Sequence, residues 1–431
     1  MISDAFWVNQ DGRLTVGGCD TLALAREYGT PLYVMDESQI RVNCRNFLNA
    51  AYNGYDGESL PIFAGKSFLC KEMCRVIASE GFGLDVVSGG ELYTAAAADF
   101  PREKIFFHGN NKSDAELTLA LEENIGRIVV DNLPELRRLS SLAMSKNKTA
   151  DILFRLKPGV DAHTHDFIST GQIDSKFGFA IETGEAFEAA RTAAELPYIN
   201  LCGIHCHIGS QIFEPEPYAT ATKVMLEFML RVKKELGISF SDLNMGGGFG
   251  IKYKKSDTPP PFAAFLEAIS ETTRDFCDTH TLSLPRLLIE PGRSIAAPAG
   301  LTLYTVGSVK EIPGKRTYVI IDGGMADNPR YALYGAPYTV MAAQKANHPA
   351  TQTVTLAGKC CESGDLIQEH TLLQAVAPGD LIAVLATGAY NYSMSSNYNR
   401  LPRPPVVMVE NGKSRVIVRG ETFEDIIRND I

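Results

Sequence analysis

The sequence lacks the features that would place the protein in a membrane or on a nucleic acid. It contains no run of about 18 apolar residues, the length that a membrane-spanning helix needs. Lys and Arg number 41 against 51 Asp and Glu, which gives a formal net charge of -10. A basic excess that would attract nucleic acid is therefore missing. We expect neither a membrane nor a nucleic acid to be a partner.

Cysteine is also sparse. The chain has nine cysteines, an odd number without regular spacing, which favours a reducing compartment. Cys70 and Cys74, like Cys202 and Cys206, are four residues apart, so neither pair has the CxxC spacing of a zinc site. We expect buried thiols there. The first residues show no basic segment followed by an apolar one, so we expect no signal peptide and a cytoplasmic protein.

Short apolar, β-branched runs alternate with helix-like stretches over the first two thirds of the chain. Each run ends in a polar or glycine-rich cluster, a pattern that predicts an α/β fold with a (β/α)8 TIM barrel. The eight runs cover residues 61–66, 83–88, 105–108, 127–131, 151–155, 203–207, 242–246 and 286–290.

From residue 301 the pattern changes to β-rich segments separated by turn signals. A chain of 431 residues is too long for one barrel, which also indicates a second domain. We therefore predict a barrel over 36–300, a C-terminal all-β domain over 301–431, and N-terminal strands within 1–35 that join the β domain.

Polar residues with catalytic potential follow the barrel strands, at the face where TIM barrels place their active sites. Lys66 ends the first strand, and a partly buried amine there can form a Schiff base. Gly246–Gly248 end the seventh strand, where backbone N–H groups can approach a phosphate. Glu290 and Arg293 follow the eighth: the carboxylate can pair with a protonated pyridine nitrogen, and the guanidinium can hold a phosphate or carboxylate.

Each of these features has a structural alternative. Lys66 can be a solvated loop lysine, Gly246–Gly248 a tight turn, and Glu290 with Arg293 a structural ion pair. His205 and His207 share one face of the sixth strand, as metal ligands do, but no third ligand follows at matched spacing, so we expect no metal. We interpret His207 as an imidazole that stacks on a cofactor ring and Ser210 as a phosphate donor. Residues 160–175 are a candidate lid.

Longer motifs occur along the whole chain and are more specific than any single glycine loop. They are Phe167–Gly171, Ser175–Gly178, Asp322–Met325, Asp327–Arg330, Leu333–Ala336, Cys361–Asp365 and Gly388–Tyr390. With these motifs the chain resembles the diaminopimelate decarboxylases, pyridoxal-phosphate enzymes of the alanine-racemase-like barrel group, from Gly29 to Pro404. It departs from them at Phe63–Phe68, where the family more often has Tyr-Ala-x-Lys-Ala-Asn, and at Tyr331, where proline is common.

The resemblance implies roles for particular residues. The cofactor would be pyridoxal 5'-phosphate, with Lys66 as its Schiff-base lysine, His207 on its ring and Glu290 at its pyridine nitrogen. Cys361 would be the proton donor, reaching the site from the partner subunit of a homodimer with shared active sites. The phosphate would be held by Ser210, Gly246, Gly247 and Gly248, with Arg293 and Tyr390 also at the cofactor. The distal end of the substrate would be bound by Arg293, Arg330, Tyr334, Glu362 and Tyr390.

The reaction implied by the resemblance is the decarboxylation of meso-2,6-diaminopimelate to L-lysine and carbon dioxide, the last step of lysine biosynthesis. Arg330 favours a distal carboxylate, because an arginine fork matches a carboxylate well. Decarboxylation of ornithine, lysine or arginine, whose distal amine needs an acidic partner, is the alternative. An amino acid racemase is less favoured, because Glu290 rather than an arginine would face the pyridine nitrogen. Retention of Lys66, Glu290 and Cys361 together disfavours a catalytically inactive binding protein.

Overall fold

The computed structural model describes residues 1–160 and 174–431, and these form two compact units. The barrel unit comprises 43–250 and 259–292, and the β unit comprises 1–42, 251–258 and 293–431. The units divide a few residues away from the predicted boundaries at 35/36 and 300/301. The segment 251–258, predicted as part of the barrel, belongs to the β unit. Most of the predicted lid 160–175, and the motif Phe167–Gly171, lie outside the described residues.

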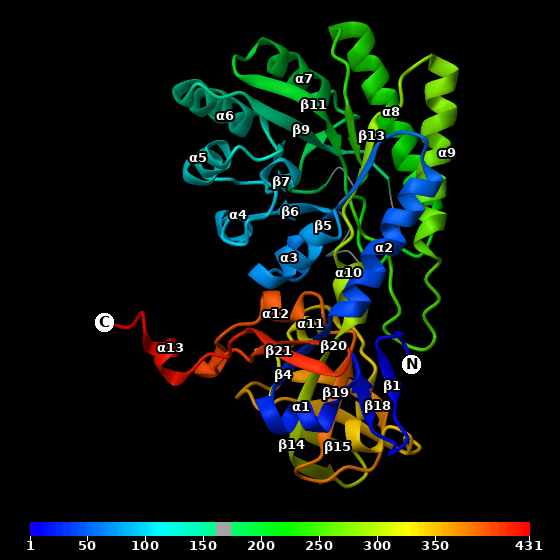
Figure 1. The fold of residues 1–431 in the computed structure, drawn as a ribbon, viewed down its shortest axis with the longest axis vertical. Helices are drawn as coiled ribbons and strands as arrows, with labels where there is room; N and C mark the ends of the chain where they lie inside the picture. The colour runs from blue at the N-terminus through cyan, green and yellow to red at the C-terminus, as the bar shows by residue number, and fades with distance from the viewer. Residues whose placement is uncertain (161–173) are drawn as a thin grey trace. The chain divides into compact units, whose positions relative to one another are not determined.

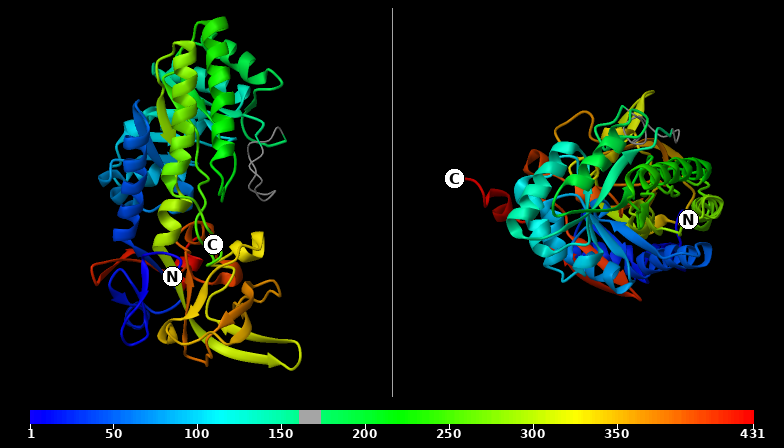
Figure 2. Two further views of the ribbon diagram at one scale, coloured as in Figure 1. Left: turned by 90° about the vertical axis from the view of Figure 1, so that its right-hand side faces the viewer. Right: turned by 90° about the horizontal axis from the view of Figure 1, so that it is seen from above.

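Eight parallel strands close into a ring in the barrel unit, in the order β5-β6-β7-β8-β9-β11-β12-β13, with β13 paired back to β5. This confirms the predicted TIM barrel, which Figure 2 (right) shows end-on with helices outside the strands. A ninth short strand, β10 (Phe179–Ala180), pairs with the end of β9. The eight are β5 (Ser59–Ala64), β6 (Gly83–Val86), β7 (Ile105–Phe107), β8 (Arg127–Val130), β9 (Ala150–Lys157), β11 (Ile199–His205), β12 (Asp242–Asn244) and β13 (Arg286–Ile289).

Several barrel helices begin at residues whose side chains cap them. Ser113 and Glu116 form a reciprocal capping box at the start of α5, and Asn132 caps α6. Asp36 accepts a hydrogen bond from the Gln39 N–H at 3.2 Å, as expected for the cap of α2. The helices are α2 (Glu37–Gly54), α3 (Lys71–Ser79), α4 (Gly89–Ala96), α5 (Asp114–Glu123), α6 (Leu133–Lys146), α7 (Glu185–Glu195), α8 (Glu216–Leu236) and α9 (Phe262–His280). Figure 1 labels them.

The barrel interior changes from apolar to polar along the strands. One layer of the core is made by Ile62, Phe106, Val129, Leu153, Cys202 and Leu288. Side chains two residues apart on a strand point to the same face, so the next inward residues are polar on several strands. Phe106 is followed by His108, Val129 by Asp131, Leu153 by Arg155 and Leu288 by Glu290. The strand period therefore places a polar layer above the apolar one at the carboxyl ends.

The β unit is built around a long strand, β14 (Gly300–Ile312), whose first half pairs with β4 and β19 and whose second half pairs with β15. The predicted N-terminal contribution is β4 (Leu32–Asp36), which lies between β14 and β20. The strands β1 (Phe6–Val8), β2 (Leu14–Val16) and β3 (Cys19–Asp20) instead form a separate small sheet. The other strands are β15 (Arg316–Ile321), β16 (Val340–Ala342), β17 (Gln352–Ala357), β18 (Leu366–Leu373), β19 (Leu381–Leu385), β20 (Val406–Glu410) and β21 (Lys413–Val418).

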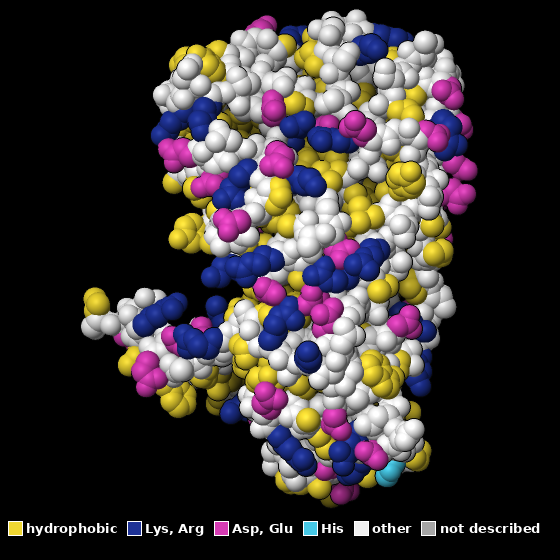
Figure 3. All heavy atoms as spheres, viewed as in Figure 1, with side chains coloured by type: hydrophobic (Ala, Val, Ile, Leu, Met, Phe, Trp, Pro, Cys, Tyr) yellow, Lys and Arg dark blue, Asp and Glu magenta, His cyan; other side chains and the backbone are white. Residues whose placement is uncertain are grey.

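Short helices complete the β unit. They are α1 (Thr21–Tyr28), α10 (Arg293–Ala296), α11 (Arg330–Tyr334), α12 (Asn391–Met394) and α13 (Phe423–Ile427). On the face drawn in Figure 3, Lys and Arg side chains are interspersed with Asp and Glu. Among the described helices, none is both long enough and apolar enough to cross a membrane.

Candidate active site

The predicted site residues of the barrel unit all lie at or just beyond the carboxyl ends of its strands. Lys66 follows β5 and is exposed, Glu290 follows β13 and is buried, and His207 and Ser210 follow β11 with intermediate exposure. Gly246–Gly248 follow β12. Because parallel strands place their carboxyl ends at one end of a barrel, the fold brings these residues to the same mouth.

The glycine triplet is required by close backbone packing. A Cβ added to Gly247 would lie 2.0 Å from the Glu290 carbonyl oxygen, and one added to Gly246 would lie 2.4 Å from that of Cys206. The Gly246 N–H donates to Asn244 Oδ1 at 2.9 Å, and the Gly247 N–H donates to His207 Nδ1 at 3.3 Å. In the described part of the chain, the Gly248 N–H is the amide of this triplet without a recorded acceptor. The predicted phosphate cradle is thus reduced to one available amide in this geometry.

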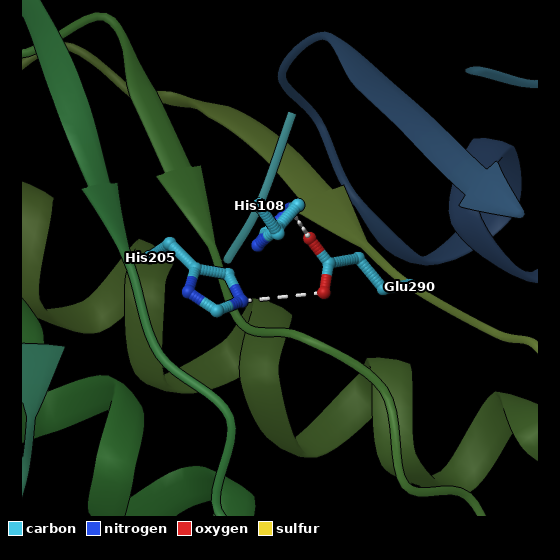
Figure 4. Close-up of side chains that lie close together, drawn as sticks. All are labelled: His108, His205 and Glu290. Carbon is cyan, nitrogen blue, oxygen red and sulfur yellow. Dashed lines mark hydrogen bonds and ion pairs between the residues drawn. The ribbon is translucent and has the colours of Figure 1, made fainter. Parts of the chain in front are cut away.

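Glu290 is held by the side chains of Asn244 in β12, of His205 in β11 and of His108 just after β7, and Figure 4 shows the two histidines. Its Oε1 accepts a hydrogen bond from Asn244 Nδ2 at 2.7 Å and lies 2.9 Å from His108 Nε2. Its Oε2 lies 3.2 Å from His205 Nε2. Burial works to raise the pKa of Glu290, but His108 and His205 outweigh it and hold the pKa well below its ordinary value. Glu290 is therefore an ionised, buried carboxylate.

His108, His205 and Glu290 also form a possible metal set. Their ligand atoms all lie within 4.8 Å of one another, and all three residues are buried. Sequence reasoning paired His205 with His207 and found no third ligand. The structure instead groups His205 with residues from β7 and β13, while His207 accepts a hydrogen bond from Gly247.

Asp85 of β6 is a second buried carboxylate, and its Oδ1 lies 3.8 Å from His108 Nε2. Burial raises the pKa of Asp85, against the opposing effect of His108, and the charge of Glu290 raises it further. Burial lowers the pKa of His205 to about 4, so this imidazole is neutral at pH 7. Burial, with the positive charges of Lys66 and Arg155, also holds the pKa of His207 well below its ordinary value. The polar layer thus concentrates negative charge on Glu290.

The β unit contains a cluster of arginines and tyrosines around Tyr253. The Tyr253 hydroxyl accepts hydrogen bonds from Arg293 Nη1 at 2.8 Å and from Arg330 Nη1 at 3.2 Å. Arg330 Nη1 also donates to Tyr338 Oη at 2.9 Å, and the Arg293 guanidinium lies 4.8 Å from the centre of the Tyr390 ring. Both arginines are buried. Two cations are thus held together by one phenol.

Contacts within this cluster shift the pKa values of Tyr253 and Arg330. Burial works to raise the pKa of Tyr253, but Arg293 and Arg330 outweigh it and lower that pKa. The pKa of Arg330 is raised, because Tyr253, Tyr338 and Tyr390 outweigh burial. Among the described residues, the recorded hydrogen-bond partners of Arg330 are hydroxyls and not carboxylates. Arg330 is therefore a buried cation suited to an incoming anion.

The remaining predicted residues lie at the surface of the β unit. Cys361 and Glu362 are exposed, and Tyr334, at the end of α11, is 36% exposed. The Cys361 N–H donates to Asn399 Oδ1 at 2.7 Å, which fixes the turn that carries the thiol. Behind the turn, the buried Asp365 accepts hydrogen bonds from the N–H groups of Cys360 at 2.7 Å and Met325 at 2.6 Å. Asp365 thereby joins the Cys361 turn to the segment that leads to Arg330.

Comparisons with known proteins match the chain over nearly its full length. Residues 37–297 match the family model "Pyridoxal-dependent decarboxylase, pyridoxal binding domain". The diaminopimelate decarboxylase of Bacillus subtilis (strain 168) is 47% identical over 98% of this chain and 96% of its own. The chain belongs to the diaminopimelate decarboxylase family. Among solved structures, the diaminopimelate decarboxylase of M. jannaschii in complex with L-lysine has a TM-score of 0.93 at 37% identity, covering 100% of this chain and 98% of its own.

A more distant family member gives the same fold. The diaminopimelate decarboxylase of Helicobacter pylori, also complexed with L-lysine, has a TM-score of 0.86 at 30% identity, covering 95% of this chain and 98% of its own. The residues at the barrel mouth fit the pyridoxal cofactor named for this family. Glu290 offers an ionised carboxylate to a pyridinium nitrogen, Lys66 an exposed amine, and Gly248 a backbone donor. Each of these groups has the chemistry that one part of the cofactor requires.

Sequence reasoning assigned no cofactor or substrate role to several residues of these clusters. In the barrel they are Asp85, His108, Arg155, His205 and Asn244; in the β unit they are Tyr253 and Tyr338, together with Asn391, whose Oδ1 accepts a hydrogen bond from Tyr338 at 3.3 Å. His108 was placed at the carboxyl end of its predicted strand, but without a role. The period of two along β9 would have found Arg155, since it follows the apolar core residue Leu153 at that spacing. Tyr253 had no such signal, because it lies in a loop that joins the β unit only in three dimensions.

Proposed function

We propose that this protein is a pyridoxal-phosphate-dependent diaminopimelate decarboxylase that converts meso-2,6-diaminopimelate to L-lysine and carbon dioxide. The main support is Arg330, which is buried and whose hydrogen-bond partners among the described residues are tyrosine hydroxyls. A buried guanidinium of this kind binds a carboxylate. The distal end of diaminopimelate carries a carboxylate, whereas ornithine, lysine and arginine have none there. The 47% identity to the Bacillus subtilis diaminopimelate decarboxylase, over 98% of this chain, supports the same substrate.

The barrel unit would hold the cofactor. Lys66 would bind its aldehyde carbon, His207 would stack on its ring, and Glu290 would face its ring nitrogen. When bound, the cofactor supplies an electron-withdrawing ring that stabilises the negative charge left by the departing carbon dioxide. The ionised state of Glu290 serves this role, because a nearby carboxylate favours a protonated ring nitrogen. The phosphate and the cofactor's edge would be bound by Ser210, the Gly248 amide, Arg293 and Tyr390. Gly246 and Gly247, whose amides donate within the protein, would let the backbone approach the phosphate closely.

The β unit would supply substrate recognition and the proton. Arg330 and Arg293 would bind the distal carboxylate, with Tyr334 and Tyr390 beside it, and the Glu362 carboxylate suits the distal ammonium. Cys361 would deliver a proton to the carbon that loses carbon dioxide. Because the Cys361 thiol is exposed on its own chain, we assign it to the site of a partner subunit in a homodimer. A biosynthetic enzyme of this kind would act in the cytoplasm.

A substrate panel tests this function. The purified holoenzyme is incubated separately with meso-diaminopimelate, L-ornithine, L-lysine and L-arginine, and released carbon dioxide and amine products are measured. We expect L-lysine from diaminopimelate and little turnover of the other three. Preferential turnover of ornithine, lysine or arginine would retain the cofactor assignment and overturn the substrate assignment. The Lys66→Ala variant is the control for cofactor-dependent release of carbon dioxide.

A further inference from the structure

Two histidines without an assigned role enclose the carboxylate of Glu290. His108 follows β7 and His205 ends β11, and their rings meet edge to face with centroids 4.7 Å apart. In Figure 4 the two rings approach different oxygens of one carboxylate. His205 Nε2 is within hydrogen-bond distance of Oε2, and His108 Nε2 makes a closer, less aligned contact with Oε1. Glu290 is therefore fixed at both oxygens.

The neutral state of His205 determines which way its proton points. An ionised carboxylate only accepts hydrogen bonds, so His205 contributes through an N–H on Nε2. Its Nδ1 is buried and has no hydrogen-bond partner among the described residues, which is consistent with the proton lying on Nε2. Since burial keeps the pKa of His205 near 4, it supports Glu290 as a dipole rather than as a charge.

His108 is also the neighbour of a competing carboxylate. Its Nε2 lies 2.9 Å from Glu290 but 3.8 Å from Asp85. Two buried carboxylates this close do not both ionise easily, so the nearer contact decides which of them keeps its charge. The pKa shifts of Asp85, upward, and of Glu290, downward, agree with this division. Removing His108 would take away the contact that stabilises the charge of Glu290 more than that of Asp85.

Other charged and titratable groups face this cluster from neighbouring elements. They are Lys66 after β5, Glu91 in α4, Asp131 after β8, Arg155 in β9, and Cys206 and His207 after β11. None of these groups is itself replaced in the variants. A change at the ring nitrogen therefore originates from the loss of the histidine, either directly or through these neighbours.

We propose that His108 and His205 are positioning residues that orient Glu290 and keep its charge, so that they determine how strongly the cofactor's ring nitrogen retains its proton. This proposal rests on the proposed cofactor role of Glu290. It adds a pair of residues that act through the carboxylate of Glu290. It also gives the barrel an internal device that selects Glu290 over Asp85 as the anion.

The test measures the ring nitrogen directly. Holoenzymes are prepared with cofactor labelled with 15N in the ring, and the nitrogen chemical shift is followed against pH in the wild type, His108→Ala, His108→Gln, His205→Ala and His205→Gln. We expect the alanine variants to lose the ring proton about one to two pH units below the wild type, the size expected for a lost charge-assisted contact. Cofactor affinity should fall about tenfold to hundredfold in parallel.

The glutamine variants distinguish a positioning role of the two histidines from a role in packing alone. Glutamine retains an N–H donor near the Nε2 position, so His108→Gln and His205→Gln should return the transition toward the wild-type pH. The exposed His280 provides a matched control, and His280→Gln should match the wild type. An unchanged nitrogen shift in His108→Ala and His205→Ala, or no rescue by glutamine in folded variants, would overturn the proposal.

The same samples address the rival metal reading and the proposed function. One equivalent of zinc in the wild-type holoenzyme, lost in both alanine variants, would assign the three residues to a metal and overturn the proposal. Turnover of diaminopimelate by the wild type is measured separately. A responsive ring nitrogen without that turnover would refute the proposed substrate and leave the role of the histidines intact.

Discussion

Replacing Arg330 with alanine should weaken diaminopimelate binding much more than it weakens the fold. Each charge-assisted hydrogen bond that Arg330 would make to a substrate carboxylate is worth about 1.5–3 kcal/mol. Since about 1.4 kcal/mol corresponds to a factor of ten, KM should rise about tenfold to hundredfold for one lost bond. The cofactor dissociation constant should change less than about twofold, because the contacts proposed for Lys66 and Glu290 remain.

The stability of the Arg330→Ala variant should change little. The substitution removes two hydrogen bonds to Tyr253 and Tyr338, but it also removes a buried cation whose recorded partners among the described residues are hydroxyls. These effects oppose each other, so we expect a net change below about 1 kcal/mol, or about 2–4 °C in Tm. Arg330→Lys keeps the charge without the planar fork and should give an intermediate KM.

Steady-state kinetics with diaminopimelate, cofactor titration and thermal unfolding check these values together. Arg316→Ala is the matched control, because Arg316 is a partly exposed residue of the β unit that pairs with Glu369 at 2.9 Å. Its KM should equal that of the wild type. An unchanged KM in Arg330→Ala, or a loss of cofactor affinity as large as the rise in KM, would refute the assignment of Arg330 to the substrate.

Further predictions concern the lysine, the thiol, the glycine loop and pH. Lys66→Ala should abolish decarboxylation and the visible absorbance of covalently bound cofactor, measured by spectrophotometry. Mixing inactive Lys66→Ala with inactive Cys361→Ala should restore about a quarter of wild-type activity if the subunits share sites; no recovery after subunit exchange counts against sharing. Gly247→Ala should weaken cofactor binding in a titration, because its Cβ would collide with the Glu290 carbonyl. The pKa of His205 is about 4 in the folded protein, against an ordinary value of 6.5, so on acidification the unfolded chain takes up the proton before the folded protein does. The free energy of unfolding should therefore fall by about 1.4 kcal/mol per pH unit from pH 6.5 toward 4. Urea denaturation measures this profile, which should be flatter in His205→Gln.

The barrel was predictable from local patterns. Strand runs such as 127–131 and 286–290 are short, β-branched and closed by polar residues, and each became a strand within one residue of its predicted start. Lys66 and Glu290 could be placed at one mouth because parallel topology fixes where strand ends lie. These inferences need only the periods of helices and strands and the handedness of the connections.

Contacts between distant segments could not be predicted in the same way. The β segments predicted at 301–309, 317–322, 353–356, 381–385 and 405–409 correspond to β14, β15, β17, β19 and β20, but β16, β18 and β21 were missed. In β18 (Leu366–Leu373) only Ile367 and Leu373 are buried, and there is no long apolar run. The Tyr253 cluster brings together Tyr253, Arg293, Arg330 and Tyr338. Their spacing in the sequence does not predict these contacts. His108 was visible at the end of its strand run, but the competition between Asp85 and Glu290 for charge depends on a difference of less than 1 Å between their distances to His108.

Asp365 limits how this enzyme can be redesigned. One buried carboxylate anchors both the backbone at Met325, which leads to Arg330, and the backbone at Cys360, which leads to Cys361. If Arg330 and Cys361 have the roles proposed above, mutations that disturb this anchor while reshaping the Arg330 segment should also displace the Cys361 turn. Libraries aimed at new amino acid substrates should therefore keep Asp365 unchanged.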